Sequence, residues 1–361
     1  MKLVYFTHSL VSDWNHGNAH FLRGVVAELM DRGHEVEVFE PADSWSRNLL
    51  LRERGLAALT DFRRAFPTLE SRAYDSKTID LHAVLDGADL VLVHEWNDPE
   101  LIHRAGVARR SAGFRLLFHD THHRAATAPE DMERLDLSEY DGVLAFGAVI
   151  RDIYLQRGWT QRAWTWHEAA DTRVFGPRPE LDREREVVWI GNWGDDERAQ
   201  ELEDFLFRPA DVLDLRGAIY GVRYPRKARK RVERAGLEYR GWLPNHRVPQ
   251  AFARHRFTVH VPRRPYVRKL PGIPTIRVFE ALACGIPLLC APWEDAEGLF
   301  RPGDDFLVAK DTEEMTSLMK ELVNDDDLAR SLAEHGRETI LERHTCAHRV
   351  DELLTVYEEL S

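Results

Sequence analysis

The sequence predicts an α/β protein made of two tandem βαβ domains followed by a helical tail. In both halves of the chain, short apolar runs alternate with stretches whose apolar residues recur at helical spacing. A charged stretch with two prolines, residues 167–186, separates the halves and is typical of a linker. The length of 361 residues also exceeds what one core usually spans. We expect one domain at 1–170, a second at 171–340, and a helix at 341–361 that crosses back to the first.

The first domain opens with a strand, a polar loop, a helix and a second strand, which is a βαβ unit and implies a parallel sheet. The stretch 21–34 has apolar residues at helical spacing, and Gly33 stands where the C-cap of that helix is expected. Strands are expected at 2–8, 35–41, 88–96, 114–123 and 140–147. Parallel α/β sheets place ligands at the carboxyl ends of their strands. We therefore expect the polar side chains at those ends to share one crevice, namely His8, His94, Glu95, His119 and Asp120.

The second half of the chain repeats the alternation. Its strands are expected at 187–193, 214–221, 237–244, 256–262, 285–292 and 305–311. From residue 313 onward the pattern is helical, and Gly336 is expected to separate two helical segments.

The composition excludes several classes of protein. Hydrophobic residues make up 43% and charged residues 30%, as in an ordinary globular protein, and the net charge of −12 favours neither nucleic acid nor an anionic membrane as partner. No apolar run is long enough for a transmembrane span, and the N-terminus has no signal-peptide pattern. The three cysteines lack CxxC spacing, which argues against a disulfide framework or structural zinc and predicts a reducing, cytoplasmic location.

The stretch "PGIPTIRVFEALACGIPLL", residues 271–289, places charges in an otherwise apolar sequence. Thr275 is suited to cap a helix that ends near Gly285, and a helix N-terminus offers free N–H groups to an anion such as a diphosphate. Glu280 accepts hydrogen bonds only, which suits a ribose diol. The alternative is that Arg277 and Glu280 form a surface pair on an ordinary helix, and local physics leaves both interpretations open.

Several stretches resemble glycosyltransferases of the GT-B architecture, which use nucleotide sugars. "RVFEALACGIPLL", "PGDDFLVAKDTEEM" and "GRETILERHTCAHRVDELL" are similar to their C-terminal domain, and "HGNAHFLRGVVAELMDRGHEVEVFEP" to their opening βαβ unit. More narrowly, the chain resembles the CgeB-like (spore maturation protein) branch, related to glycosyltransferase family 4. The resemblance covers nearly the whole chain. It implies two Rossmann-like domains and a metal-independent, retaining hexosyltransferase with a nucleotide-diphosphate sugar as co-substrate and no other cofactor.

The resemblance also assigns roles. It implies that Glu280 binds the ribose and that the loop before it contacts the diphosphate, with Pro274 only shaping that loop. The implied donor-binding residues are Gly272, Ile273, Pro274, Thr275, Arg277, the basic Arg263, Arg264, Arg268 and Lys269, and Gly191, Asn192 and Trp193 of "GNWGDDER". Those implied for the sugar and acceptor side are His16, Gly17, Asn18, His94, Glu95 and His122. One position departs from family 4, since Gly272 stands where many members have a second glutamate that touches sugar hydroxyls.

The cluster "FHDTHHRA", residues 118–125, is the candidate catalytic segment. The resemblance places His119 beside the reacting sugar, and imidazole titrates near neutral pH. Asp120 is the alternative base if the reaction inverts the anomeric centre. Two rival interpretations are a metal site and histidines that only cap a strand end. Nearby Trp96 is interpreted as loop packing, with a stacking platform for a sugar or an aromatic group as the alternative.

Other functions stay open at this stage. A nucleotide-sugar epimerase has the same architecture, and the missing glutamate is compatible with a donor-binding or interaction protein without turnover. The basic segment 224–236 is interpreted as a solvated helix face rather than a nucleic-acid site. The acceptor, whether small molecule, glycan or protein, is not specified by the sequence.

Overall fold

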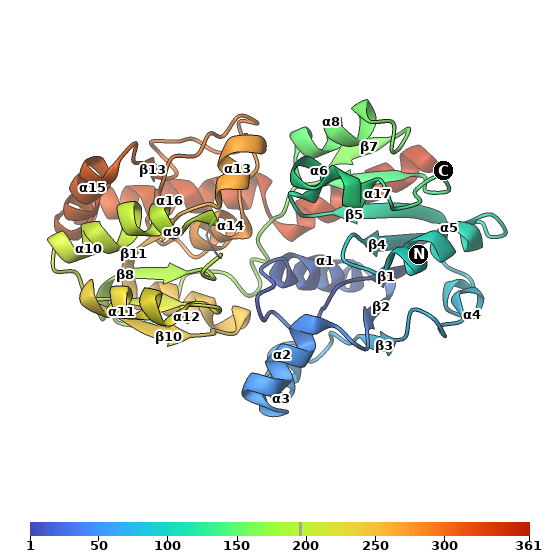
Figure 1. Cartoon of the computed structure of the whole chain (residues 1–361), viewed down its shortest axis with the longest axis horizontal. Coiled ribbons are helices and arrows are strands. Elements are labelled where there is room, and N and C mark those ends of the chain that lie inside the picture. The colour runs from blue at the N-terminus through green and yellow to red at the C-terminus, as the bar shows by residue number, and fades with distance from the viewer. Residues whose placement is uncertain (195–196) are drawn as a thin grey trace. The chain divides into compact units, whose positions relative to one another are not determined.

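The computed structural model describes residues 1–194 and 197–361. The chain divides into two compact units, Met1–Glu168 with Cys346–Ser361, and Ala169–Thr345. Each unit is a parallel sheet flanked by helices (Figure 1). The predicted fold of two Rossmann-like α/β domains with a C-terminal helix is therefore confirmed.

The N-terminal unit contains a seven-stranded sheet in the order β3-β2-β1-β4-β5-β6-β7. Its strands are β1 (Lys2–Phe6), β2 (Glu35–Pro41), β3 (Arg72–Tyr74), β4 (Leu90–His94), β5 (Arg115–Asp120), β6 (Gly142–Ala145) and β7 (Ala163–Thr165). Its helices are α1 (Ala19–Asp31), α2 (Trp45–Arg54), α3 (Ala57–Ala65), α4 (Leu81–Leu85), α5 (Pro99–Arg109), α6 (Arg124–Thr127), α7 (Pro129–Met132), α8 (Ala148–Gln156) and α17 (Cys346–Leu360). The central strands are buried on both faces, as expected of a parallel sheet covered by helices.

The last helix of the chain completes the N-terminal unit. Helix α17 packs on α1, whose Phe21, Leu22 and Val25 are buried. Arg32 pairs with Asp351 at 2.5 Å, and the indole of Trp166 donates a hydrogen bond to a carbonyl of α17 at 2.8 Å. The C-terminal residues are thus part of the N-terminal core.

The C-terminal unit contains a six-stranded sheet in the order β10-β9-β8-β11-β12-β13. Its strands are β8 (Arg185–Ile190), β9 (Gly217–Tyr220), β10 (Leu237–Gly241), β11 (His255–His260), β12 (Leu288–Cys290) and β13 (Leu307–Val308). Its α-helices are α9 (Ala199–Leu202), α10 (Arg208–Val212), α11 (Arg226–Arg234), α12 (Val248–Ala253), α13 (Arg264–Lys269), α14 (Ile276–Ala283), α15 (Thr312–Asn324) and α16 (Asp326–Arg343). A π-helical turn, η2 (Glu203–Phe207), joins α9 to α10, and a 3-10 turn, η3 (Asn245–Arg247), precedes α12.

One sequence prediction about the tail is wrong. Gly336 does not separate two helices but lies buried inside α16. A Cβ atom there would stand 2.6 Å from Leu282 Cδ2 of α14, so glycine lets the two helices approach closely. The break comes instead between α16 and α17, after Arg343.

Within the described part of the chain, no helix combines the length and the apolar character that crossing a membrane requires.

Candidate functional site

Each sheet has one point where its strand order reverses, and polar side chains gather there. In the N-terminal sheet this point lies between β1 and β4, and in the C-terminal sheet between β8 and β11. Two neighbouring strands whose crossovers leave in opposite directions open a crevice at their carboxyl ends, which is where α/β folds bind ligands. Each unit therefore has its own candidate site, at the reversal point of its sheet.

In the C-terminal unit, Glu280 is fully buried in the second turn of α14. Its Oε2 forms an ion pair with Arg277, and its Oε1 accepts a hydrogen bond from Asn245 Nδ2 at 3.2 Å. The pair between Arg277 and Glu280 that the sequence allowed is therefore present. It is not a surface pair, because the carboxylate is buried while 26% of the arginine side chain is exposed.

The loop before α14 is fixed from within the unit. Gly272 N–H donates to the Glu294 carbonyl at 3.0 Å, and Ile273 N–H donates to the Leu270 carbonyl at 3.3 Å. Thr275 is the N-cap of α14, and its hydroxyl lies 3.1 Å from His260 Nε2. Two of the amides predicted to meet a diphosphate are thus already engaged, so the loop contributes by positioning the first turn of α14.

The backbone conformation at position 272 and the closeness of Glu297 explain why no glutamate stands there. The φ angle of Gly272, +88°, is one that side chains rarely adopt. A Cβ atom would lie 2.8 Å from Glu297 Cγ and 3.1 Å from the Glu297 nitrogen. The side chain of Glu297 therefore occupies the space that a residue at 272 would need.

Three arginines converge at the carboxyl ends of β8 and β11. The half-buried Arg198 donates to the carbonyls of Val261 (3.2 Å) and Asn192, and its guanidinium stacks 5.1 Å from the centre of the Trp189 ring. Burial, and next the nearby Arg263, lower the pKa of Arg198 to about 10, and Arg277 acts in the same direction. Like charges held this close favour an anion between them.

Gly194 shows how close two of these guanidinium groups are. A Cβ atom on Gly194 would stand 2.9 Å from Nε of Arg198 and 3.2 Å from Nε of Arg263. Arg263 also faces Glu197 at 3.3 Å. Sequence reasoning predicted Arg263 and Arg277 but missed Arg198, which stands in the quoted "GNWGDDER" stretch. Its neighbours Asp195 and Asp196 lie outside the described residues.

The other basic residues of the prediction are placed less centrally. Arg264 is held by Glu201 through a 2.6 Å hydrogen bond, and Arg268 and Lys269 are exposed on α13.

The loop after β8 is anchored to the end of β9. Asn192 Oδ1 accepts a hydrogen bond from Val222 N–H at 2.9 Å, and Trp193 N–H donates to the Val222 carbonyl at 3.1 Å. Gly191 packs against the Trp189 ring, where a Cβ atom would be 2.5 Å from the indole. This loop holds the carbonyls that orient Arg198.

In the N-terminal unit, β5 ends with His119 and Asp120, which are both completely buried. His119 Nδ1 lies 2.5 Å from the Tyr5 hydroxyl, and its ring packs on Trp166 and His94 with centroids 4.8 and 5.3 Å away. Among the described residues its Nε2 has no hydrogen-bond partner. Burial lowers the pKa of His119 to about 3, so the ring is a neutral hydrogen-bonding group and a weak base.

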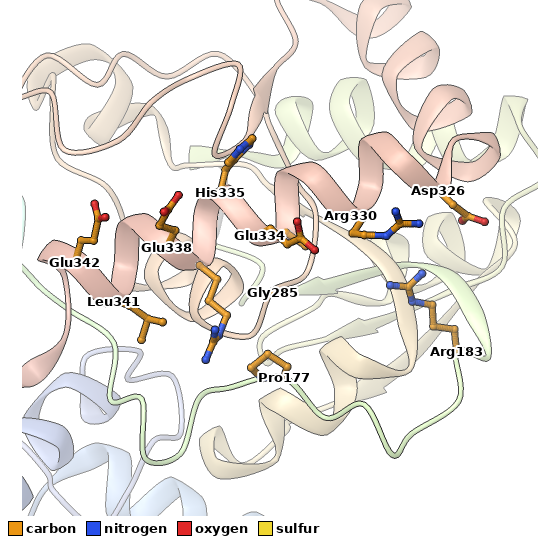
Figure 2. A pocket seen from close by; sticks show the side chains of 12 residues that line it. Pro177, Arg183, Gly285, Asp326, Arg330, Glu334, His335, Glu338, Leu341 and Glu342 are labelled. Atoms are coloured by element: carbon orange, nitrogen blue, oxygen red, sulfur yellow. The ribbon is translucent and has the colours of Figure 1, made fainter.

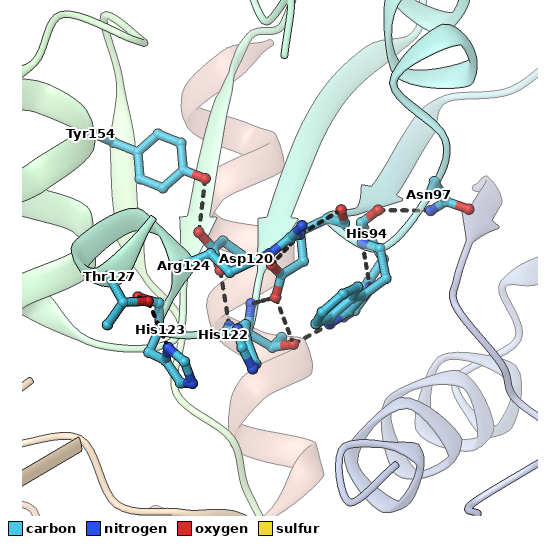
Figure 3. A network of polar contacts seen from close by, with 11 residues as sticks. His94, Asn97, Asp120, His122, His123, Arg124, Thr127 and Tyr154 are labelled. Carbon is cyan, nitrogen blue, oxygen red and sulfur yellow. Dashed lines mark hydrogen bonds and ion pairs between the residues drawn. The ribbon is translucent and has the colours of Figure 1, made fainter. Parts of the chain in front are cut away.

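Asp120 lies in a network with the buried Glu95 and Tyr154 and the partly buried Arg124, and Figure 3 shows the Tyr154 hydroxyl directed at Asp120. Asp120 accepts from the Tyr154 hydroxyl at 2.8 Å and from His122 N–H at 2.9 Å, while Glu95 pairs with Arg124 at 2.7 Å. Burial, and then the charge of Asp120, raise the pKa of Glu95 to about 8, and burial raises that of Asp120. These partners favour a positioning role for Asp120 over that of a base.

The structure brings four of the N-terminal histidines together. His8 and His16 meet with ring centroids 4.9 Å apart, and His94 contacts His119 and binds the Thr121 hydroxyl at 3.0 Å. His122 stands apart from these contacts and packs instead against Trp96, at 5.1 Å.

The glycine-containing loop before α1 contacts the carboxylate of Glu168. Asn18, the N-cap residue of α1, donates from Nδ2 to Glu168 Oε1 at 2.7 Å, and Gly17 precedes it. In the described ranges, no three His, Cys, Asp or Glu side chains are arranged to hold a metal ion.

A large open groove of about 980 Å³ lies along α16 (Figure 2). It is lined by Pro177, Arg183, Gly285 and nine residues of α16. None of the predicted site residues is among them, and its charges are mixed, so it does not belong to the candidate site.

Comparisons with known proteins agree with this architecture. Residues 198–355 match the family described as glycosyl transferase-like. The whole chain is similar in fold to HepE from Anabaena, solved with UDP and glucose, with a TM-score of 0.71, 13% identity and 99% coverage of each chain. It is also similar to sucrose-phosphate synthase from Thermosynechococcus elongatus, with a TM-score of 0.67, 14% identity and coverage of 100% of this chain and 99% of that one. No curated protein sequence matches. Residues 198–355 are thus similar to a glycosyl transferase-like family, and the whole chain shares its two-domain fold with GT-B glycosyltransferases.

Proposed function

We propose that this protein is a glycosyltransferase, which moves a hexosyl group from a nucleotide-diphosphate sugar to a hydroxyl-bearing acceptor. The observation that carries the proposal is the convergence of Arg198, Arg263 and Arg277 beside the N-terminus of α14. Three guanidinium groups and a helix N-terminus suit the diphosphate, whose charge grows as the sugar leaves. UDP is the first nucleotide to test, because HepE was solved with it.

Glu280 is proposed to accept hydrogen bonds from the ribose hydroxyls. Asn245 and Arg277 already hold its two oxygens in one orientation. An oriented carboxylate loses little conformational freedom when a diol binds. The neutral His119 is proposed to hydrogen-bond the transferred sugar rather than to remove its proton.

Retention of the anomeric configuration stays a proposal, as does membership of the CgeB-like branch related to family 4. The glycine at position 272 is compatible with that branch, and we propose that the neighbouring Glu297 supplies the carboxylate on this side of the sugar. Product analysis by NMR of the new glycosidic linkage decides the stereochemistry.

Transfer without a metal ion is also proposed. T4 phage BGT, which is similar in fold with a TM-score of 0.60 and 12% identity, was solved with UDP and Mn²⁺, so the metal requirement has to be tested. Turnover that is unchanged by EDTA supports metal independence, and loss of turnover that Mn²⁺ restores contradicts it.

A cytoplasmic location is proposed from the cysteines. Cys284, Cys290 and Cys346 are all buried as free thiols. Burial raises the pKa of Cys284 and Cys290, so both thiols stay protonated and unreactive.

The donor site is tested by calorimetric titration with UDP, GDP, dTDP, ADP, CDP and uridine, on wild type, Arg198→Gln and the control Arg216→Gln. Arg216 is exposed and immediately precedes β9, so it lies at the amino end of that strand, away from the carboxyl ends of β8 and β11. We expect one diphosphate to bind, with an affinity that falls roughly ten- to a hundredfold in Arg198→Gln, because a charge-assisted hydrogen bond is lost. The affinity for the diphosphate should be unchanged in Arg216→Gln. The weak binding of uridine should be the same in all three proteins. Absence of binding by every diphosphate contradicts the proposed function.

A further inference from the structure

Two exposed tryptophans lie near one buried histidine in the N-terminal unit. Trp45 is 40% exposed and Trp96 36% exposed. Their rings lie 4.8 and 6.3 Å from the ring of His8, which follows β1. Trp96 follows β4, so this cluster sits at the reversal point of the N-terminal sheet. Trp96 packs against His122 and Arg124 and also exposes part of its ring, so loop packing and a stacking platform both stay open as interpretations.

Contacts with the loop after β1 hold Trp45 in place. Trp45 is the first residue of α2, and the next residue, Ser46, hydrogen-bonds Ser12 at 2.9 Å and the Trp14 carbonyl at 2.7 Å. The Trp14 ring meets the Trp45 ring edge-on at 6.3 Å, and its own indole donates to Glu53 at 2.8 Å. The start of α2 is thus attached to the loop after β1.

Trp96 is fixed in a comparable way. The guanidinium of Arg124 lies 4.2 Å from the centre of its ring, and Arg124 is itself held by the buried Glu95 at 2.7 Å. This is the same network that Figure 3 shows around Asp120. Both exposed rings are therefore held in place before any ligand arrives, which reduces the entropy cost of stacking on them.

Near the two tryptophan rings, His8 and His16 each have a buried ring nitrogen without a hydrogen-bond partner among the described residues. His8 is 3% and His16 8% exposed, and Nε2 of each has no hydrogen-bond partner among the residues that the structure describes. Buried polar atoms without partners are rare and require an explanation. Burial lowers the pKa of His8 to about 4 and that of His16 well below its ordinary value, so both rings are neutral and each Nε2 either donates or accepts.

The charged groups around this cluster already face opposite charges. Arg23, which approaches His16, pairs with Asp13 at 3.0 Å. Arg47, two residues after Trp45, lies 3.7 Å from Glu40, and Arg124 pairs with Glu95. The cluster therefore offers aromatic faces and neutral hydrogen-bonding groups. Each of the three nearby arginines already faces a carboxylate, although Nε of Arg47 has no hydrogen-bond partner among the described residues.

We infer that Trp45, His8, His16 and Trp96 form a subsite for an uncharged saccharide ring, so that the acceptor of the proposed transfer is a carbohydrate. A sugar ring combines an apolar C–H face for the tryptophans with hydroxyls for the two histidine nitrogens. An aromatic acceptor without hydroxyls would leave both nitrogens without partners. An anionic acceptor would compete with the carboxylates that already face Arg23, Arg47 and Arg124. The saccharide subsite itself does not depend on the proposed function, because saccharide binding is measured without a donor. Only the role of that saccharide as the acceptor rests on the proposed function.

The test is saturation-transfer-difference NMR with methyl β-glucopyranoside, maltose, cellobiose and lactose, with and without saturating UDP. A flavonol and glycerol 3-phosphate serve as the aromatic and anionic probes. The variants are Trp45→Ala, Trp96→Ala and His8→Phe, which keeps a ring but removes the nitrogens. Leu56→Ala is the control, since Leu56 is 73% exposed and lies outside the cluster. The unfolding midpoint of each variant shows that it is folded.

We expect at least one saccharide to bind, with saturation strongest on the C–H protons of its ring. Its affinity should fall roughly tenfold or more in both tryptophan variants and in His8→Phe, and not in Leu56→Ala. Absence of saccharide binding, or binding that the folded variants leave intact, overturns the inference. So does a preference for the flavonol or for glycerol 3-phosphate. UDP titrated into the same samples tests the donor site separately, so the two proposals fail independently.

Discussion

Arg277 and Glu280 form an ion pair on α14 in which the carboxylate is fully buried and the guanidinium is partly exposed. The pair therefore has one member fixed in the protein and one facing outward. Asn245 holds the second carboxylate oxygen, so the orientation of Glu280 is set without a ligand. An arrangement of this kind is suited to bind a diol, and it is also suited to brace the helix.

Replacing Glu280 with glutamine separates these two roles. The amide retains the size of the side chain but loses the charge that strengthens hydrogen bonds from hydroxyls. We expect wild type to bind UDP roughly tenfold or more tightly than 2′-deoxy-UDP, and Glu280→Gln to discriminate little between them. Calorimetric titration of both nucleotides measures the ratio. A lower unfolding temperature with an unchanged ratio would show that Glu280 is only structural.

The carboxyl pair of Glu95 and Asp120 predicts a pH-dependent stability. Burial and the nearby Asp120 raise the pKa of Glu95 from 4.5 to about 8, so between these values the native state holds a proton that the unfolded chain has released. The stabilisation is complete below pH 4.5 and is lost as the pH rises through about 8. Each such group lowers the free energy of unfolding by up to about 1.4 kcal/mol per pH unit in that window.

Asp120→Asn is the matched variant for this pH dependence. Its amide oxygen can still accept from Tyr154, but the like charge that disfavours ionised Glu95 is gone. We expect urea unfolding at pH 6, 7, 8 and 9 to show a shallower decline in Asp120→Asn than in wild type. Equal slopes would mean that the two carboxyl groups do not share a proton.

Gly272 should not tolerate a side chain. Gly272→Ala combines an unfavourable φ of +88° with a contact of 3.1 Å to the Glu297 backbone nitrogen. Gly298→Ala is the control, because its φ is +64° and nothing lies within 4 Å of the added carbon. We expect the control to cost about 1 kcal/mol of unfolding free energy and Gly272→Ala roughly 1–3 kcal/mol more, measured by urea titration. Equal costs would remove the steric explanation for the missing glutamate.

Gly336 tests the packing of α16 on α14. Alanine at this position would approach Leu282 Cδ2 to 2.6 Å and the Asp305 carbonyl to 2.9 Å. Alanine favours a helix over glycine by about 1 kcal/mol, but these close contacts should cost more than that. We therefore expect Gly336→Ala to lower the free energy of unfolding by roughly 1–2 kcal/mol, measured by urea titration. Gly106→Ala in α5 is the control, because its added carbon would lie 3.2 Å from Glu139 Cβ, a milder contact that should cost less than Gly336→Ala. A stabilised Gly336→Ala would contradict this account of the packing.

Most of the fold was predictable because periodicity reports burial directly. The fully buried β1, β4 and β5 are continuous apolar runs, and β2 was predicted with its observed bounds, Glu35–Pro41. The short edge strands β3 and β7 were missed, since three residues carry no recognisable period. Gly336 misled the prediction because a glycine chosen for close helix packing looks, in sequence, like a helix end.

The site was less predictable, because its parts come from separate crossovers. Arg198 stands in a charged stretch that reads as a solvated loop, and its importance comes only from the sheet order that brings it beside Arg263. Trp45 carries no sequence signal at all. Its relation to His8 depends on how α2 attaches to the loop after β1. The tertiary placement of loops, rather than their composition, determines both.

The return of α17 to the N-terminal unit has a consequence for how the protein is made. Residues 1–168 leave the ribosome first, but their core lacks the surface that α17 covers on α1 until residues 346–361 have been synthesised. The C-terminal unit, which is continuous in sequence from Ala169 to Thr345, can close before the unit that precedes it. The N-terminal unit is thus the first to be translated and the last whose core is fully formed. A premature stop codon that removes only the final helix would leave the earlier unit, not the later one, without its full core.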